Sequence, residues 1–185
     1  EPTRGLAGPM LEDTTEILSK NKEYHLDKIY NEENIKSALG RWKGFGYHQK
    51  VELAPGLEAT FLDAGHILGS AIIKIKAEGK TLIFSGDLGN FPAPILEPTE
   101  KIDSADYCLI ESTYGDRIHE GVDKRREQLE DAIEDTVKSR GVLLIPTFAM
   151  ERTQELLYHL HELFEQGRIP KAPVFIDSPL AIKLT

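Results

Sequence analysis

The chain changes from one arrangement of strands to another part-way along, and this change constrains its fold more than any other feature. Between residues 51 and 85 apolar and polar residues alternate, and Glu78-Gly79 forms a tight turn between two short runs, which is typical of antiparallel hairpins. From residue 123 onward helical apolar spacing alternates with short apolar runs, which is typical of βαβ units and a parallel sheet. The sequence therefore predicts an α/β protein in two differently built parts, with a boundary near residues 113 to 120.

The individual elements follow from the same patterns. Apolar residues at helical spacing predict helices over residues 11–19, 31–43, 123–140 (capped by Asp123) and 152–166. Ser178 followed by Pro179 predicts the start of a further helix. Short apolar or alternating runs predict strands over residues 57–62 (partly buried), 70–77, 80–85, 107–110 (buried), 142–145 and 174–176.

Composition narrows the class of protein. The 185 residues are 40% hydrophobic and 29% charged, which is enough to bury a sizeable core. No run of about 18 apolar residues is present, so we expect no membrane span, and the first ten residues lack the pattern of a secretory signal. The single cysteine, Cys108, lies in an apolar run; we expect a buried thiol and a cytoplasmic, reducing location.

The charge of the chain bears on which partners and surfaces we expect. The net charge of −9 argues mildly against a nucleic-acid binder, although a binding surface can be local. The basic cluster 124–126 has acidic neighbours, so we expect it on a solvated helix face.

The chain begins at Glu1 without an initiator methionine and stops at Thr185, where a helix has just begun. We therefore expect a fragment of a longer protein.

Polar residues gather where the predicted strands end. Asp63 and His66 follow one strand, Asp87 follows another, and Glu111 follows the next, each in a turn with glycine beside it or close by. Strand ends are where α/β sheets place active sites. An imidazole with carboxylates suits Zn²⁺ or Mn²⁺, and a carboxylate can bridge two ions about 3.5–4 Å apart. The alternative is that these residues only hydrogen-bond the backbone of their turns.

The other five histidines are not arranged as metal ligands. They occupy loop-like stretches or a helix, and we expect ordinary polar roles for His25, His48, His119, His159 and His161. His159 and His161 are two residues apart on a predicted helix, so their side chains point away from each other.

Five sequence motifs resemble those of a known family. Residues 63–71 resemble the third motif of metallo-β-lactamase-fold nucleases, and residues 85–90 resemble the fourth. Glu111-Ser112-Thr113-Tyr114-Gly115-Asp116-Arg117 is similar to motif A of the β-CASP subfamily. Residues 145–149 with 152–157, and residues 175–181, are similar to segments inside the β-CASP domain. The matches occur in the family's order across residues 51 to 185, and a weaker one at 6–13 extends the resemblance towards the N-terminus.

The resemblance implies a fold and a site. The expected fold is part of a metallo-β-lactamase αββα sandwich over residues 1–115, followed by the first part of a β-CASP α/β domain over residues 116–185. The family holds two zinc ions. By resemblance, His66 is a ligand of one zinc, Asp87 bridges both, and Glu111 supports the site by hydrogen bonding to a ligating histidine. Asp87 and Glu111 are therefore the expected catalytic residues.

The resemblance also implies a function with open alternatives. The expected protein is a zinc-dependent ribonuclease that hydrolyses RNA phosphodiester bonds in RNA processing or decay, with a second copy or a related β-CASP subunit as a partner. A DNA nuclease of the same superfamily and a non-catalytic β-CASP scaffold subunit remain alternatives; the presence of His66 and Asp87 favours an enzyme.

The sequence departs from the family's pattern in two respects. The family's His-x-His-x-Asp-His motif and its later histidine motifs are not in the chain, so we expect the chain alone to be inactive. In addition, Met150-Glu151 stands where a small residue and a glycine are usual.

Overall fold

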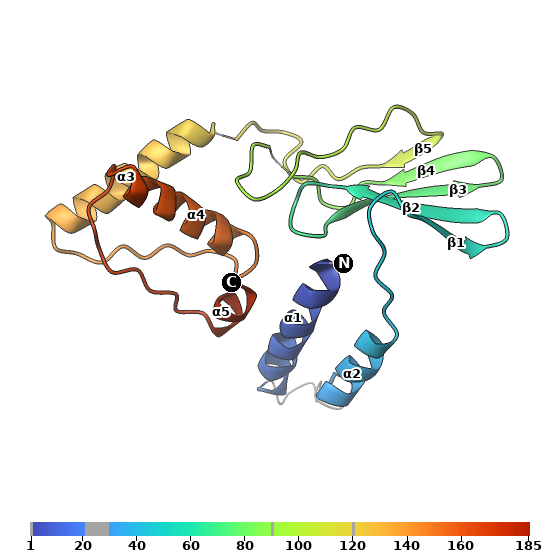
Figure 1. The fold of residues 1–185 in the computed structure, drawn as a ribbon, viewed down its shortest axis with the longest axis horizontal. Helices are drawn as coiled ribbons and strands as arrows, with labels where there is room; N and C mark the ends of the chain where they lie inside the picture. The colour runs from blue at the N-terminus through green and yellow to red at the C-terminus, as the bar shows by residue number, and fades with distance from the viewer. Residues whose placement is uncertain (1, 21–29, 90, 120) are drawn as a thin grey trace. The chain divides into compact units, whose positions relative to one another are not determined.

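The computed structural model describes residues 2–20, 30–89, 91–119 and 121–185 (Figure 1). The chain folds into two compact units. The first, unit 1, is built mainly from the chain up to Phe91 together with Glu97–Glu111. The second, unit 2, is built mainly from Pro92–Leu96 and Ser112–Lys183.

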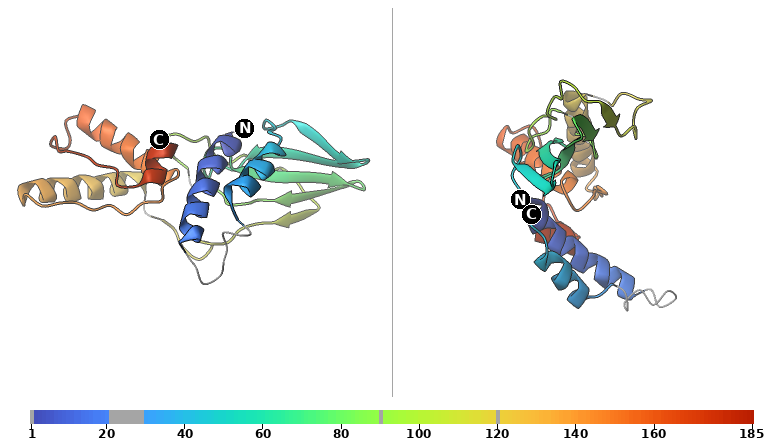
Figure 2. Two further views of the ribbon diagram at one scale, coloured as in Figure 1. Left: turned by 90° about the horizontal axis from the view of Figure 1, so that it is seen from below. Right: turned by 90° about the vertical axis from the view of Figure 1, so that its right-hand side faces the viewer.

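Unit 1 contains a five-stranded sheet whose strands lie side by side in chain order, as the views in Figures 1 and 2 show. The strands are β1 (Lys50–Ala54), β2 (Leu57–Asp63), β3 (Ala71–Ala77), β4 (Lys80–Phe84) and β5 (Tyr107–Leu109). The first four pair antiparallel, and β5 pairs parallel to β4. At the predicted hairpin turn, Glu78 and Gly79 both have positive φ, at 50° and 72°, as two-residue hairpin turns require. The hairpin prediction is therefore confirmed.

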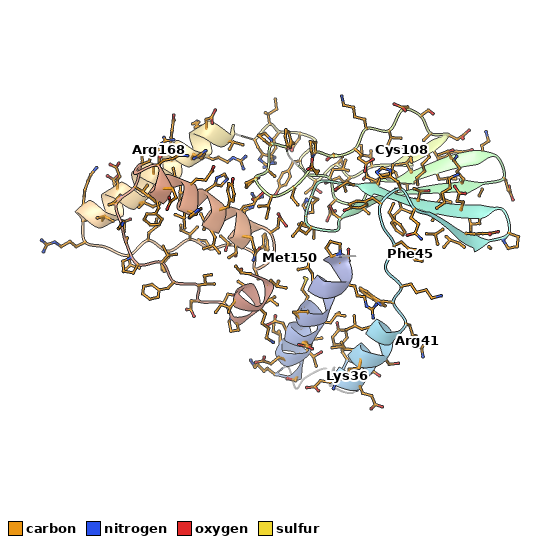
Figure 3. All side chains as sticks on the ribbon, in the orientation of Figure 1. Lys36, Arg41, Phe45, Cys108, Met150 and Arg168 are labelled. Carbon is orange, nitrogen blue, oxygen red and sulfur yellow. The ribbon has the colours of Figure 1, made fainter. Side chains whose placement is uncertain are left out.

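The core of unit 1 lies where the central strands meet their turns. It is formed by the buried residues Ala64, Ile72 and Ile83 with partly buried Leu62, Leu88 and Ile102. The expected burial of the 107–110 strand was wrong, and so was the expected burial of Cys108, because all of β5 is exposed. The reason is its position: β5 is the last strand in the sheet order, so it pairs with a neighbour on one side only. Cys108 is labelled in Figure 3.

Two helices complete unit 1. They are α1 (Pro2–Ser19) and α2 (Glu32–Gly40), which lie side by side. Both helix predictions are confirmed, but α1 begins nine residues earlier than the 11–19 pattern indicated, and α2 ends at Gly40. Asn31 caps α2 by accepting a hydrogen bond from the Asn34 N–H at 3.0 Å.

Unit 2 consists of helices and the segments that join them. The helices are α3 (Val122–Lys138), α4 (Arg152–Glu165) and α5 (Pro179–Leu184). Their core is the buried cluster Ile133, Leu160, Leu163 and Ile169. The helix predictions are confirmed, although Gly121 rather than Asp123 is the N-cap of α3. The Ser178 hydroxyl accepts a hydrogen bond from the Ala181 N–H at 3.1 Å, so the predicted start of α5 is also confirmed.

The two strands expected in unit 2 are not formed. In the part of the chain that the structure describes, residues 142–145 and 174–176 pair with no other strand. Val142 is 83% exposed and Phe175 86% exposed. An extended segment becomes a strand only when a neighbour supplies hydrogen bonds, and the sheet's strands all lie in unit 1. The α/β class of the chain is confirmed, but the parallel layer predicted for residues after 123 is corrected.

Across the residues that the structure describes, no helix is both long and apolar enough to cross a bilayer.

Candidate metal centre

The turn that carries His66 is held by hydrogen bonds to its own side chains. Gly65 has a φ of +63°, and its N–H donates to the Asp63 carboxylate at 2.8 Å. The Ser70 hydroxyl accepts from the N–H groups of His66 at 3.0 Å and Ile67 at 3.2 Å. The backbone of His66 is therefore fixed while its side chain is exposed.

A second segment, residues 97–100, supports this turn. The Thr99 hydroxyl donates to the Ala64 carbonyl at 2.8 Å, and the Glu100 carboxylate accepts from the Asp63 N–H at 2.7 Å. A Cβ on Gly65 would lie 2.7 Å from the Thr99 nitrogen, so only glycine fits at 65. Sequence reasoning missed Thr99 and Glu100, because they lie in the proline-rich stretch of residues 91–100, which carries no periodic pattern.

The turn that carries Asp87 is tied to Glu111. Buried Ser85 accepts the Glu111 N–H on its hydroxyl at 3.0 Å and donates to the Gly86 carbonyl at 2.7 Å. The Glu111 carboxylate accepts the Leu88 N–H at 2.6 Å. Glu111 therefore positions the backbone next to Asp87, whose side chain is exposed. The hydrogen bond from Glu111 to a ligating histidine stays a prediction.

The two turns touch through glycine backbone. The Gly89 N–H donates to the Ala64 carbonyl at 2.9 Å. A Cβ on Gly89 would overlap the Gly65 carbonyl oxygen, so any larger residue at 89 would force the turns apart. The structure thus brings the turns of His66 and Asp87 together, as their strand-end positions indicated. Asn90, the last residue of the matched motif, lies outside the described residues.

The donor set at these turns fits part of a metal site. One imidazole and one carboxylate are ligands that zinc takes, and the adjoining turns present both to solvent. Within the described ranges, no three His, Cys, Asp or Glu side chains come together to hold an ion. Two of the usual three or four protein ligands are therefore the most that these turns supply.

Tyr47 also contacts the His66 turn. Its hydroxyl donates to the Ser70 carbonyl at 2.8 Å. Burial raises the pKa of Tyr47 above its usual 10.0, and the neighbouring Asp63 and Glu100 carboxylates raise it further. Its phenol is therefore neutral at physiological pH. Sequence reasoning missed Tyr47, whose only signal was the glycine-rich loop around it.

The other histidines contact different partners. His48 Nε2 lies 3.3 Å from the Glu100 carboxylate, and His159 Nδ1 lies 3.7 Å from that of Glu162. The His119 ring packs edge-on against Tyr114. His161 is exposed, and His25 lies outside the described residues.

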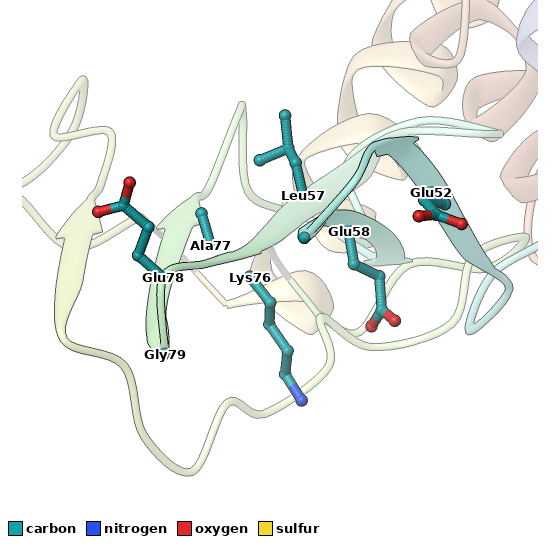
Figure 4. Close-up of a pocket in the computed structure, with 8 residues that line it drawn as sticks. Glu52, Leu57, Glu58, Lys76, Ala77, Glu78 and Gly79 are labelled. Carbon is teal, nitrogen blue, oxygen red and sulfur yellow. The ribbon is translucent and has the colours of Figure 1, made fainter.

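A shallow hollow of about 320 Å³ lies at the other end of the sheet (Figure 4). Its lining includes Glu52, Glu58 and Lys76 around the β1–β2 and β3–β4 turns. Because His66 and Asp87 follow the opposite ends of β2 and β4, this hollow is not part of the candidate metal centre.

Comparisons with known proteins agree with the motifs. The family model of the Beta-Casp domain matches residues 153–185. Ribonuclease TTHA0252 of Thermus thermophilus is 36% identical over 93% of this chain and 38% of its own length. An RNase J-like protein of Methanocaldococcus jannaschii is 31% identical over 84% of this chain and 38% of its own length. Cleavage and polyadenylation specificity factor subunit 3-I of Arabidopsis thaliana is 32% identical over 91% of this chain and 24% of its own length.

The fold and the matches together define the class. Polar residues in turns at strand ends are where α/β proteins place binding and catalytic groups. Residues 153–185 match the Beta-Casp domain, and over most of its length the chain is similar to proteins named as ribonucleases and as a cleavage and polyadenylation factor; both findings support a β-CASP protein of the metallo-β-lactamase fold. It spans between 24% and 38% of the length of the three relatives named above.

Proposed function

We propose that the complete protein is a zinc-dependent ribonuclease that hydrolyses RNA phosphodiester bonds, with His66 and Asp87 among its metal ligands. The observation that carries the proposal is the contact between the two ligand-bearing turns through Gly89 and Ala64. The similarity to proteins named as ribonucleases and as a cleavage and polyadenylation factor supports RNA as the substrate.

The proposed roles follow from the geometry of each residue. His66 supplies an imidazole, and the exposed Asp87 supplies a carboxylate that can bridge two ions. Glu111 is a positioning residue, because its carboxylate accepts the Leu88 N–H next to Asp87. Zinc, when bound, supplies Lewis acidity that activates water for attack on phosphorus. The remaining ligands come from parts of the complete protein outside this chain.

The experiment is the Asp87→Ala variant of the complete protein, with Asp103→Ala as a matched control. Asp103 is an exposed aspartate of the same unit. We expect Asp87→Ala to abolish both zinc content and cleavage of an RNA oligonucleotide, and Asp103→Ala to leave both unchanged. Normal zinc stoichiometry in Asp87→Ala would overturn the ligand assignment. Preferential cleavage of a DNA oligonucleotide of the same sequence would overturn the substrate.

The proposal extends to this chain, to partners and to location. The 185-residue chain alone should bind zinc weakly and cleave nothing, and tight binding of two zinc ions by it would contradict the half-site. A second copy or a related β-CASP subunit is the proposed partner. The single cysteine supports a cytoplasmic location, because cytosolic chains rarely rely on disulfides.

A further inference from the structure

A hollow of about 480 Å³ lies in unit 1, lined by α1, the loop after α2, Phe61 of β2, and Gly69 and Ala71 at the start of β3. Its size is within the range of small-molecule sites. Its lining contains four aromatic residues and two cationic ones: Trp42, Phe45, Tyr47, Phe61, Arg4 and Lys43. The proposed zinc-dependent cleavage assigns no role to these side chains.

The aromatic rings form a surface suited to a planar ligand. Phe45 and Phe61 are stacked, with ring centroids 6.3 Å apart and planes 12° from parallel. Trp42 and Tyr47 are large aromatic residues that remain 40% and 37% exposed. Stacking on exposed aromatic side chains is how proteins hold single-stranded bases without reading their sequence.

The charge around the hollow selects for an anion. The chain has a net charge of −9, yet among the described residues the lining includes Arg4 and Lys43 and no acidic residue. Tyr47, the phenol of this lining, is kept neutral by its raised pKa, and its hydroxyl is engaged with the Ser70 carbonyl. The lining itself therefore presents only positive charge to a phosphate; the Asp63 and Glu100 carboxylates that raise the pKa of Tyr47 are not part of it.

The hollow adjoins the turn that carries His66. Gly69 and Ala71 line it, and the Thr3 hydroxyl donates to the Gly69 carbonyl at 2.9 Å. A ligand in the hollow therefore lies beside the backbone of the candidate metal centre. A polynucleotide whose phosphate sits at the metal centre can place a nearby nucleotide in the hollow.

We propose that this hollow binds one nucleotide of single-stranded RNA, with its base against the aromatic rings and its phosphate against Arg4 and Lys43. The choice of RNA over other nucleic acid rests on the proposed function; the aromatic and cationic lining is independent of it. The hollow holds the substrate strand outside the point of cleavage.

Trp42 makes the proposal measurable, because it is the only tryptophan of the chain. The 185-residue chain is titrated with a short oligoadenylate RNA in the presence of EDTA, and Trp42 fluorescence is followed. We expect saturable quenching that weakens as salt rises from about 50 to about 200 mM, because phosphate contacts release counterions. Arg4→Glu and Lys43→Glu should each weaken the affinity roughly tenfold through repulsion of phosphate.

Lys36→Glu is the matched control, because Lys36 is an exposed lysine of α2 that does not line the hollow (Figure 3). It makes the same charge change and should leave the affinity within about twofold. Absence of quenching, or equal effects of Lys43→Glu and Lys36→Glu, would overturn the proposal. Quenching by an uncharged apolar peptide with no dependence on salt would assign the hollow to a protein partner instead. Because the assay contains no metal, failure of the ribonuclease proposal would leave this result unaffected.

Discussion

The two units respond differently to the same kind of sequence signal. Short apolar runs in unit 1, such as residues 80–84, form paired strands, whereas the runs at 142–145 and 174–176 in unit 2 remain unpaired and exposed. In unit 1, turns between consecutive strands pair β1 to β4 antiparallel, and β5 finds a parallel neighbour in β4, so the sheet forms within the chain. The comparison teaches that an apolar run predicts where a strand can form, while a hydrogen-bonding neighbour decides whether it does.

Both units use side-chain hydrogen bonds and ion pairs, and one example from each shows what these contacts hold. In unit 1, side chains such as Ser85 and Glu111 hydrogen-bond the backbone of adjacent turns and so fix functional positions. In unit 2, ion pairs join α3 to its surroundings: Arg168 pairs with Glu130, and Arg126 lies 3.6 Å from Glu162. Lys124 and Arg125 are exposed, as the expected solvated face requires, whereas Arg126 is partly buried.

The largest expected effect tests whether unit 2 depends on its apolar cluster alone. Leu163 is fully buried, so Leu163→Ala should lower the free energy of unfolding of unit 2 by about 2–5 kcal/mol. Hydrogen exchange would show faster exchange in α3 and α4, with the sheet amides of unit 1 unchanged. Phe175→Ala is the control, because a side chain that is 86% exposed should change the stability by less than about 0.5 kcal/mol. Equal loss of protection in both units would show that they unfold as one.

The next effect tests the close contact between turns in unit 1. Gly89→Ala places a Cβ on the Gly65 carbonyl oxygen and should destabilise unit 1 by about 1–3 kcal/mol, since backbone on both sides resists movement. Thermal unfolding followed by circular dichroism measures the loss. A Cβ on Gly40, near the end of α2, meets no atom within 4 Å, so Gly40→Ala should not destabilise. Comparable unfolding temperatures for the two variants would contradict the turn contact.

A smaller effect concerns Glu151 in unit 2, which has φ +65° and ψ −58° and is buried at the N-cap of α4. The backbone of any residue with a Cβ is strained at these dihedral angles, and glycine relieves the strain. Glu151→Gly should therefore raise the free energy of unfolding by about 1 kcal/mol. Chemical denaturation measures the change. Glu151→Ala removes the carboxylate but keeps the Cβ; if it stabilises as much as glycine does, backbone strain is not the cause.

Sequence reasoning reached the local features of both units and missed the tertiary ones. The Glu78-Gly79 turn, the Ser178 cap and the strand-end positions of His66 and Asp87 are encoded by neighbouring residues, so pattern reading finds them. The sequence also marked position 151, where glycine was expected and the backbone has a positive φ. The contacts of Thr99 and Tyr47 join segments that are distant in the sequence, so no local sequence pattern predicts them.

The smallest effect concerns the one parallel pairing among the described strands of unit 1. Asp106, the residue before β5, accepts the Thr81 N–H at 2.8 Å and the Lys80 ammonium at 2.9 Å. The hydrogen bond from the Thr81 N–H lowers the pKa of Asp106 below its usual 3.8, and the hydrogen bond from Lys80 lowers it further. A carboxylate with a lowered pKa stabilises the folded state above its unfolded pKa and loses that contribution as the pH falls through its folded pKa.

Asp106→Asn should therefore speed hydrogen exchange at the Thr81 amide at neutral pH, with the difference from the parent chain shrinking as the pH falls below about 3.8. The exposed Asp103→Asn, which makes the same change of charge nearby, should show no such difference. A difference that persists undiminished at low pH would mean that side-chain shape rather than charge joins β5 to the sheet. In that case the charge of Asp106 would contribute nothing to the parallel pairing of β5 with β4.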